Sequence, residues 1–141
     1  MTKKAYYDWS AIEDMTQDIL QQTRDKQFDA VVGLTRGGLT PAVLVSQYLD
    51  IPMHTLKVSL RDHKGIEDMP KPDCNILVID DINDTGATLN YLQESWGHDT
   101  VTYAVLINNE ASEADVDYSS VDINKREDDV WIVFPWEDWW K

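Results

Sequence analysis

The sequence predicts an α/β protein with one domain, built on a central parallel sheet flanked by helices, and three observations support this fold class. Short apolar runs alternate with amphipathic segments of about ten residues, which is the pattern of βα units joined by right-handed crossovers. The runs are apolar at nearly every position, as are strands covered on both faces. With 141 residues and one cysteine, the chain is expected to form a single domain, residues 1–141, without disulfide bonds.

The first half of the chain predicts a helix, a strand and a second helix. Ser10 and Glu13 have the spacing of a capping box. The apolar residues of this first helix fall on one face: Ile12, Met15, Ile19 and Leu20. Residues 29–34 form an apolar run typical of a buried parallel strand. Thr40 is expected to cap the second helix, because Pro41 suits its first position.

The second half continues the alternation of strands and helices. The expected segments are a strand over 53–60, a loop over 61–73, a buried strand over 75–80, a helix over 85–96, a strand over 101–107 and a short strand over 118–123. Gly97 is expected to end the helix before it. The aromatic tail, 131–140, is expected to pack back on the domain.

Charge and hydropathy exclude several classes of partner. The net charge is −14, with 26 acidic against 12 basic residues, whereas nucleic acids and anionic membranes require a basic surface. No apolar stretch reaches the roughly 18 residues of a membrane span, and the N-terminus lacks a signal-peptide core. We therefore expect a cytoplasmic protein that binds small molecules. We also expect a homo-oligomer, either a dimer or a tetramer.

The run from Ile76 to Thr88 carries the strongest chemical signal. An apolar strand leads into the adjacent acids Asp80 and Asp81, and a short turn brings a third acid, Asp84. The segment that follows opens a helix: Thr85, Gly86, Ala87 and Thr88. Backbone N–H groups, two hydroxyls and the positive end of a helix together bind anions well. The two acids can hold ribose hydroxyls directly or through a metal-bound water. The alternative, an acidic cap and an ordinary turn, does not account for the whole run.

A second loop, Thr35-Arg36-Gly37-Gly38, follows the strand over 29–34. Exposed N–H groups at such glycines can bind a diphosphate; the loop taken alone is more typical of a plain turn, and its place beside the run from Ile76 favours the binding role. Both loops follow parallel strands directly, so they are expected at the same edge of the sheet, where ligands bind.

Residues 76–89 resemble the signature of type I phosphoribosyltransferases. Within that family the chain is similar to the small xanthine-guanine enzymes in four segments, taken in order: the helix from Trp9, the Arg-Gly-Gly loop, the run from Ile76, and the Trp-Ile…Pro-Trp tail. The resemblance implies a 5-phosphoribosyl-1-pyrophosphate donor, Mg²⁺, and transfer to a purine base (xanthine, guanine or hypoxanthine) with release of pyrophosphate. It also implies the family's fold, with a small C-terminal hood formed mainly by residues 108–141 and some N-terminal residues.

The resemblance implies a role for each matching residue. Asp80 and Asp81 would face the ribose hydroxyls, and Asp84 would accept the proton of the base. The 5′-phosphate would lie on residues 85–88. Arg36 and Gly37 would bind the pyrophosphate, often with a cis peptide between them. Trp131 would stack on the base, Ile132 would meet its exocyclic amine through the backbone carbonyl, and Mg²⁺ would be held by Asp80, Asp81 and Glu137.

Two features leave questions open. The 6-oxopurine enzymes carry a Lys after the fourth strand that donates to O6 of the base, whereas this chain has Asn108 there, a neutral donor that is weaker than an ammonium. In the family the loop over 61–73 closes during the reaction, so that Arg61, His63 and Lys64 could reach the pyrophosphate. The alternatives are an enzyme for another base, or a regulatory protein that senses the donor without catalysis.

Overall fold

The computed structural model describes residues 2–58, 60 and 71–141, so the roles expected of Arg61, His63 and Lys64 lie outside the described residues. In chain order the elements are β1 (Lys3–Tyr6), α1 (Trp9–Gln22), β2 (Ala30–Leu34), α2 (Leu39–Leu49), β3 (Met53–Leu56), β4 (Ile76–Asn83), α3 (Ala87–Trp96), β5 (Val101–Asn109), β6 (Tyr118–Ile123) and β7 (Val130–Val133).

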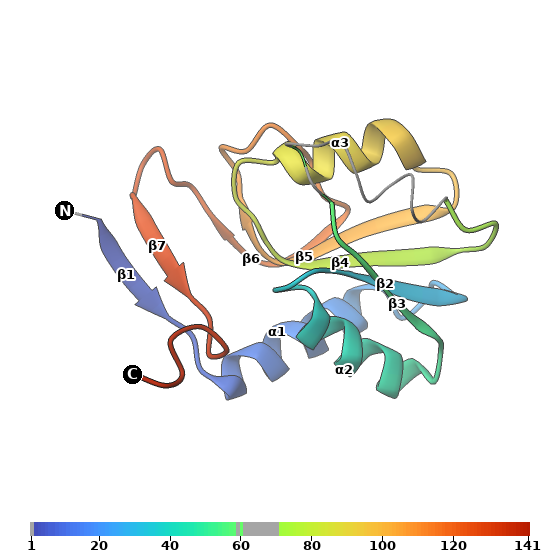
Figure 1. Cartoon of the computed structure of the whole chain (residues 1–141), viewed down its shortest axis with the longest axis horizontal. Coiled ribbons are helices and arrows are strands. Elements are labelled where there is room, and N and C mark those ends of the chain that lie inside the picture. Colours follow the sequence, from blue (N-terminus) through green and yellow to red (C-terminus); the bar gives the residue numbers. More distant parts are fainter. Residues whose placement is uncertain (1, 59, 61–70) are drawn as a thin grey trace.

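The main sheet has the strand order β3-β2-β4-β5-β6, and all of its pairs are parallel, which confirms the predicted fold class. The strands β2 and β4 are neighbours, as Val32 pairs with Val78. A second, two-stranded sheet joins β1 to β7 in parallel, beside the main sheet (Figure 1). The sequence did not predict β1. Residues 118–123, which belong to the segment expected to form the hood, are the strand β6 at the edge of the main sheet.

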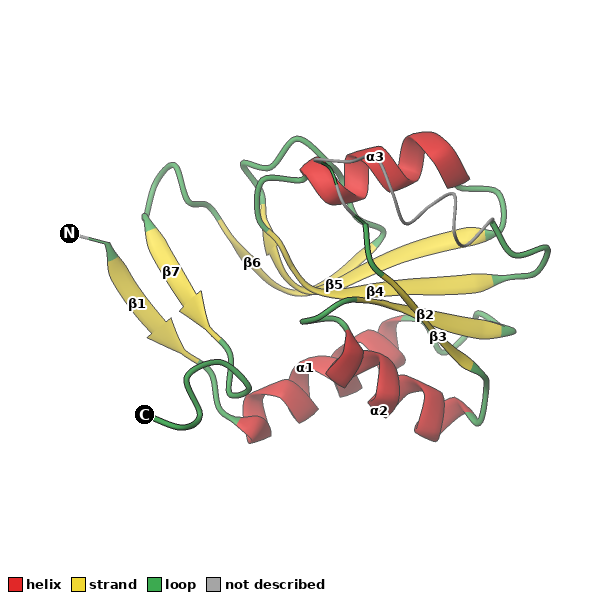
Figure 2. Cartoon of the chain, in the orientation of Figure 1, coloured by secondary structure: helices red, strands yellow, loops and turns green. Residues whose placement is uncertain are grey.

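Helices cover both faces of the main sheet (Figure 2). On one face, α1 and α2 pack on alternate strand residues in a buried cluster that includes Ile12, Ile19, Val45, Leu77, Ile79 and Leu106. On the other face, α3 packs on the intervening residues, among them Val32, Val78, Leu92, Tyr103 and Val105. Burial on both faces explains why these strands are apolar at almost every position.

Two of the expected helix caps are wrong by a few residues. The Asp8 carboxylate, rather than Ser10, caps α1, because its Oδ1 accepts a hydrogen bond from the backbone N–H of Ala11 at 2.8 Å. The helix α2 begins at Leu39 after Gly38, which has no side chain to cap it. Asp and Ser are both common capping residues, so the sequence pattern placed the cap of α1 two residues too late.

The strands β4 and β5 run further than the sequence predicts. Pairing continues through Ile82 with Ile107 and Asn83 with Asn108, so the strand does not end at Asp80, and Asp81 also lies within β4. The backbone of a strand can pair with its neighbour whatever the polarity of its side chains. The prediction ended both strands where the apolar residues end, and it therefore made them too short. The result is that both acids are fixed on the sheet.

Candidate active site

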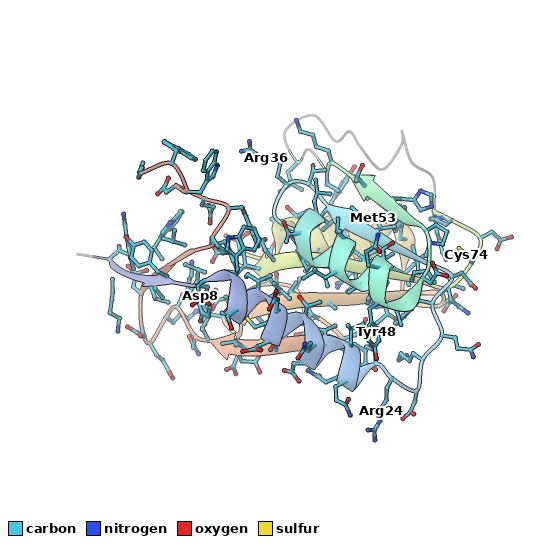
Figure 3. All side chains as sticks on the ribbon, turned by 90° about the horizontal axis from the view of Figure 1, so that it is seen from below. Asp8, Arg24, Arg36, Tyr48, Met53 and Cys74 are labelled. Carbon is cyan, nitrogen blue, oxygen red and sulfur yellow. The ribbon has the colours of Figure 1, made fainter. Side chains whose placement is uncertain are left out.

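The loops after β2 and β4 meet at the carboxyl edge of the sheet, as predicted. The carboxylate of Asp81 lies directly against the Cα of Gly37, so that a Cβ at this position would overlap with it. A pocket of about 650 Å³ opens here. It is lined by Arg36, Gly37, Thr40 and Asp81, and by Trp136, Glu137, Asp138 and Trp140 of the tail. Arg36 extends from its loop toward the C-terminal tail (Figure 3).

Two further hollows adjoin this pocket, and each shares lining residues with its neighbour. A small one of about 120 Å³ shares Asp81 and Glu137 with the first, and its walls also include Asp84, Trp131 and Ile132. A third, of about 480 Å³, shares Asp84 and Lys125 with the second and reaches Thr85. The structure therefore places the cation of the Arg-Gly loop, Asp81, Asp84, the exposed Trp131 ring and the start of the anion-binding segment around three adjoining hollows, whereas Asp80 lines none of the three.

The two adjacent acids lie in a poorly solvated environment. Burial, followed by the charge of Asp81, raises the pKa of Asp80 well above its ordinary value. Burial also raises the pKa of Asp81, although hydrogen bonds, including one from the backbone N–H of Ile82, act in the opposite direction. Neither carboxylate forms an ion pair with a described Lys or Arg. Two such carboxylates can accept hydrogen bonds from the hydroxyl groups of a ligand, or bind a cation that the ligand brings with it.

We expect Asp80→Asn to stabilise the unliganded protein at neutral pH by about 1 kcal/mol, or roughly 2–5 °C in Tm. Because the pKa of Asp80 is higher in the folded chain than in the unfolded chain, its ionisation opposes folding at pH 7, and this effect vanishes below about pH 4. Thermal melts from pH 4 to pH 8 should therefore show a gain that shrinks on acidification. The exposed Asp25→Asn serves as the control, and a gain independent of pH would contradict the prediction.

The anion-binding segment opens α3 as expected, with Ala87 as the first helical residue and Thr88 in the first turn. Gly86 has φ +90°, and a Cβ there would lie 2.6 Å from the backbone N of Ala114. The backbone N–H of Glu113 donates to the carbonyl of Thr85 at 2.9 Å. Glycine is therefore required by the segment packed behind the loop, in addition to the close approach of an anion that the sequence predicts.

Asn108 belongs to a polar cluster beneath this loop. The Nδ2 of the buried Asn83 lies 2.8–2.9 Å from three acceptors: Asn108 Oδ1, Ser112 Oγ and the Ala114 carbonyl. The described residues that line the hollow beside Trp131 do not include Asn108. This cluster holds the ends of β4 and β5 and the following loop together.

Lys125 is a pocket residue that the sequence analysis missed. Its ammonium lies 2.9 Å from Asp84 Oδ1 and 5.6 Å from the centroid of the Trp131 ring. The available signal was its place beside Arg126, since these are the only basic residues in the otherwise acidic segment 108–129.

The three proposed metal ligands do not form a preformed site. Among the described residues, no group of three His, Cys, Asp or Glu side chains is arranged to hold a metal ion. The carboxylate of Glu137 instead accepts a hydrogen bond from the backbone N–H of Phe134 at 3.0 Å. Mg²⁺ commonly uses one or two carboxylates together with substrate phosphates and water, and Asp81 and Glu137 on the wall of the large pocket fit that mode.

The structure also shows where the cis peptide lies and how the aromatic tail packs. The cis peptide lies between Thr35 and Arg36, one bond before the position that the resemblance implied; without proline, sequence carries no signal for its place. Phe134 and Trp136 stack with centroids 4.9 Å apart, so the tail packs on itself as well as on the domain. Across the described part of the chain, no helix is both long and apolar enough to cross a bilayer.

Comparison with known proteins agrees with this geometry. A family model for the phosphoribosyl transferase domain matches residues 2–138. A xanthine-guanine phosphoribosyltransferase of Cereibacter sphaeroides is 32% identical over 122 residues, covering 77% of this chain and 68% of the relative. One of Idiomarina loihiensis is 25% identical over 146 aligned positions, covering 96% and 88%. A solved purine phosphoribosyltransferase of Pyrococcus horikoshii has a TM-score of 0.77 at 28% identity, covering 96% and 95%. Because the family model spans nearly the whole chain, the protein belongs to the phosphoribosyltransferase family.

Proposed function

We propose that this protein transfers the phosphoribosyl group of 5-phosphoribosyl-1-pyrophosphate to a purine base and releases pyrophosphate. The observation that carries the proposal is the set of adjoining hollows at the carboxyl edge of the sheet, in which the anion-binding loops and the exposed Trp131 adjoin Asp81 and Asp84. The names of the relatives from Cereibacter sphaeroides and Pyrococcus horikoshii support a purine as the acceptor.

The proposed reaction forms a bond between a base nitrogen and C1 of the ribose and breaks the bond from C1 to the pyrophosphate oxygen. Arg36 and the backbone of Gly37 bind the leaving pyrophosphate, on which negative charge develops. Asp80 and Asp81 orient the sugar through its hydroxyls. Asp84 accepts the proton that the purine loses from N7 as the new bond forms.

The remaining residues position the two substrates. The 5′-phosphate binds to the segment Thr85, Gly86, Ala87 and Thr88 at the N-terminus of α3. The base stacks on Trp131, which is 55% exposed, while the buried residue Ile132 also lines the same hollow. Stacking contributes about 1–3 kcal/mol for any base, so it fixes the plane of the base but not its identity.

Mg²⁺ is proposed as the cofactor, with Asp81 and Glu137 as the protein ligands that fit best. When bound, the ion neutralises charge on the pyrophosphate oxygens. Asp80 and Asp81 have elevated pKa values from burial, and a cation beside them would favour their ionised forms. Cytoplasmic location and assembly as a dimer or tetramer stay predictions from the sequence.

A panel of free bases supplied with the donor and Mg²⁺ tests the proposal by pyrophosphate release. We expect turnover with hypoxanthine, guanine or xanthine and little with orotate or uracil. Turnover with only a non-purine base would leave the transferase class intact and refute the purine assignment. Donor binding without turnover on any base would instead favour a sensor of phosphoribosyl pyrophosphate.

A further inference from the structure

Lys125 occupies the end of the site where the base is expected to bind. It lies between β6 and β7, and its side chain is only 18% exposed. Its ammonium contacts the Asp84 carboxylate at 2.9 Å and faces the Trp131 ring at 5.6 Å from the centroid. The same lysine lines both hollows that adjoin Asp84. A cation in contact with both the proton acceptor and the stacking ring lies within reach of the edge of a stacked base.

The backbone position of Lys125 is fixed by the buried residue Asn109. The Oδ1 of Asn109 accepts a hydrogen bond from the backbone N–H of Lys125 at 3.0 Å, while its Nδ2 donates to the carbonyl of Asp84 at 2.8 Å. One side chain at the end of β5 therefore ties both members of the ion pair to the sheet. Their relative position does not depend on the long lysine side chain alone, as it does in most surface pairs.

Lys125 and Asp84 together can distinguish purines by the hydrogen-bonding groups at the edge of the base. A 6-oxopurine presents the acceptor O6 beside N7, whereas a 6-aminopurine presents an amine donor beside N7. An ammonium donates to O6 but has no acceptor for an amine. With the carboxylate of Asp84 on N7 of the base, an ammonium beside that carboxylate reaches the group at position 6. A hydrogen bond from a charged donor is also stronger than one from a neutral amide.

We propose that Lys125 selects 6-oxopurines over 6-aminopurines, in place of a residue at the end of β5. This inference rests on the proposed function. It accounts for the absence of a lysine at position 108, where the Oδ1 of Asn108 is already bonded to Asn83. In this proposal the cation that contacts the base is Lys125, from the segment between β6 and β7, and it lies on the same side of the base as Trp131.

The competing explanation is that Lys125 only neutralises Asp84. In that case its loss would affect every base alike, because the charge of Asp84 is needed whichever base reacts. A selecting role predicts instead that the loss depends on the group at position 6. The ratio of the two substrates therefore distinguishes the explanations, whereas the overall rate does not.

The test compares Lys125→Met, Lys125→Arg and the control Lys3→Met, which removes another lysine paired with an aspartate, at 3.2 Å from Asp128 on the surface. We measure kcat/KM for hypoxanthine and adenine, and Kd for inosine and adenosine monophosphates by calorimetry. For Lys125→Met we expect the preference for the oxo substrate and the oxo nucleotide to fall about 10- to 100-fold. Lys125→Arg should retain most of the preference, and Lys3→Met all of it.

Each outcome decides one of the two proposals. An unchanged ratio of both kcat/KM and Kd in a folded Lys125→Met protein would overturn the selecting role while leaving transfer to purines in place. Melting curves establish that the variant is folded, and nucleotide Kd values remain measurable even if turnover is lost. A wild-type protein that binds neither nucleotide and uses no purine would refute the proposed function itself.

Discussion

Replacing Asp84 by Asn is expected to lower kcat by about 10²- to 10⁴-fold while changing the affinity for the phosphoribosyl donor only a few-fold, the range typical of a lost general base. The carboxylate can take the proton of the base nitrogen, and a carboxamide of the same shape cannot. The backbone should stay in place, because the hydrogen bond from Asn109 goes to the main-chain carbonyl of Asp84. The loss should therefore fall on chemistry rather than on folding or donor binding.

Steady-state kinetics with the preferred base, together with donor binding measured by calorimetry, separate these effects. Asp122→Asn is the matched control, because Asp122 is an exposed aspartate of the neighbouring β6 that bonds to Ser119. It should change kcat less than two-fold or so, as is usual for a surface position. If Asp84→Asn weakened donor binding as much as it slowed turnover, Asp84 would be a binding residue and not the proton acceptor.

The adjacent glycines of the Arg-Gly-Gly loop are expected to respond to alanine in opposite ways. At Gly38 a Cβ would lie 2.8 Å from both the backbone N and O of Leu34 and would overlap with the carbonyl of Ile79. These are backbone atoms of two central strands, which cannot move aside without breaking the sheet. Gly38→Ala should therefore destabilise the fold by about 3 kcal/mol or more.

At Gly37 the three atoms nearest to the new methyl group all belong to the side chain of Asp81. A side chain can rotate away, so Gly37→Ala should change stability by less than about 1 kcal/mol. The displaced carboxylate would no longer face the pocket in the same way. Since a misplacement of about 1 Å can reduce a rate 10²-fold, we expect kcat/KM to fall about 10- to 100-fold.

Urea denaturation and kcat/KM on both variants test this pair. Gly97→Ala is a useful reference: a Cβ there meets no atom within 4 Å, although φ is +70°, so it reports backbone strain without a clash. A stable Gly38→Ala protein would show that β2 and β4 can separate locally. An unaffected rate in Gly37→Ala would indicate that the position of the Asp81 carboxylate is not important for catalysis.

The main features of the fold were predictable because they depend on local patterns. Apolar runs at residues 29–34 and 75–80 identified the central strands, and their burial on both faces follows from the helices between them. The loops that follow these strands were recognised by acids, glycines and hydroxyls at fixed spacing. Parallel strands place their carboxyl ends at one edge, and so the placement of both loops at that edge followed from the sequence, whereas the contact of Gly37 with Asp81 is seen only in the structure.

The sequence by itself determined the fold class, the family and the loops that carry the chemistry, since each depends on residues that are close together in the sequence. Only the tertiary structure decided which side chains meet across long separations. It paired β1 with β7, bonded Asn108 to Asn83, and brought Lys125 to Asp84 and Trp131. Such contacts depend on the register of distant strands and on the path of the chain between them. Neither quantity leaves a periodic signal in the sequence.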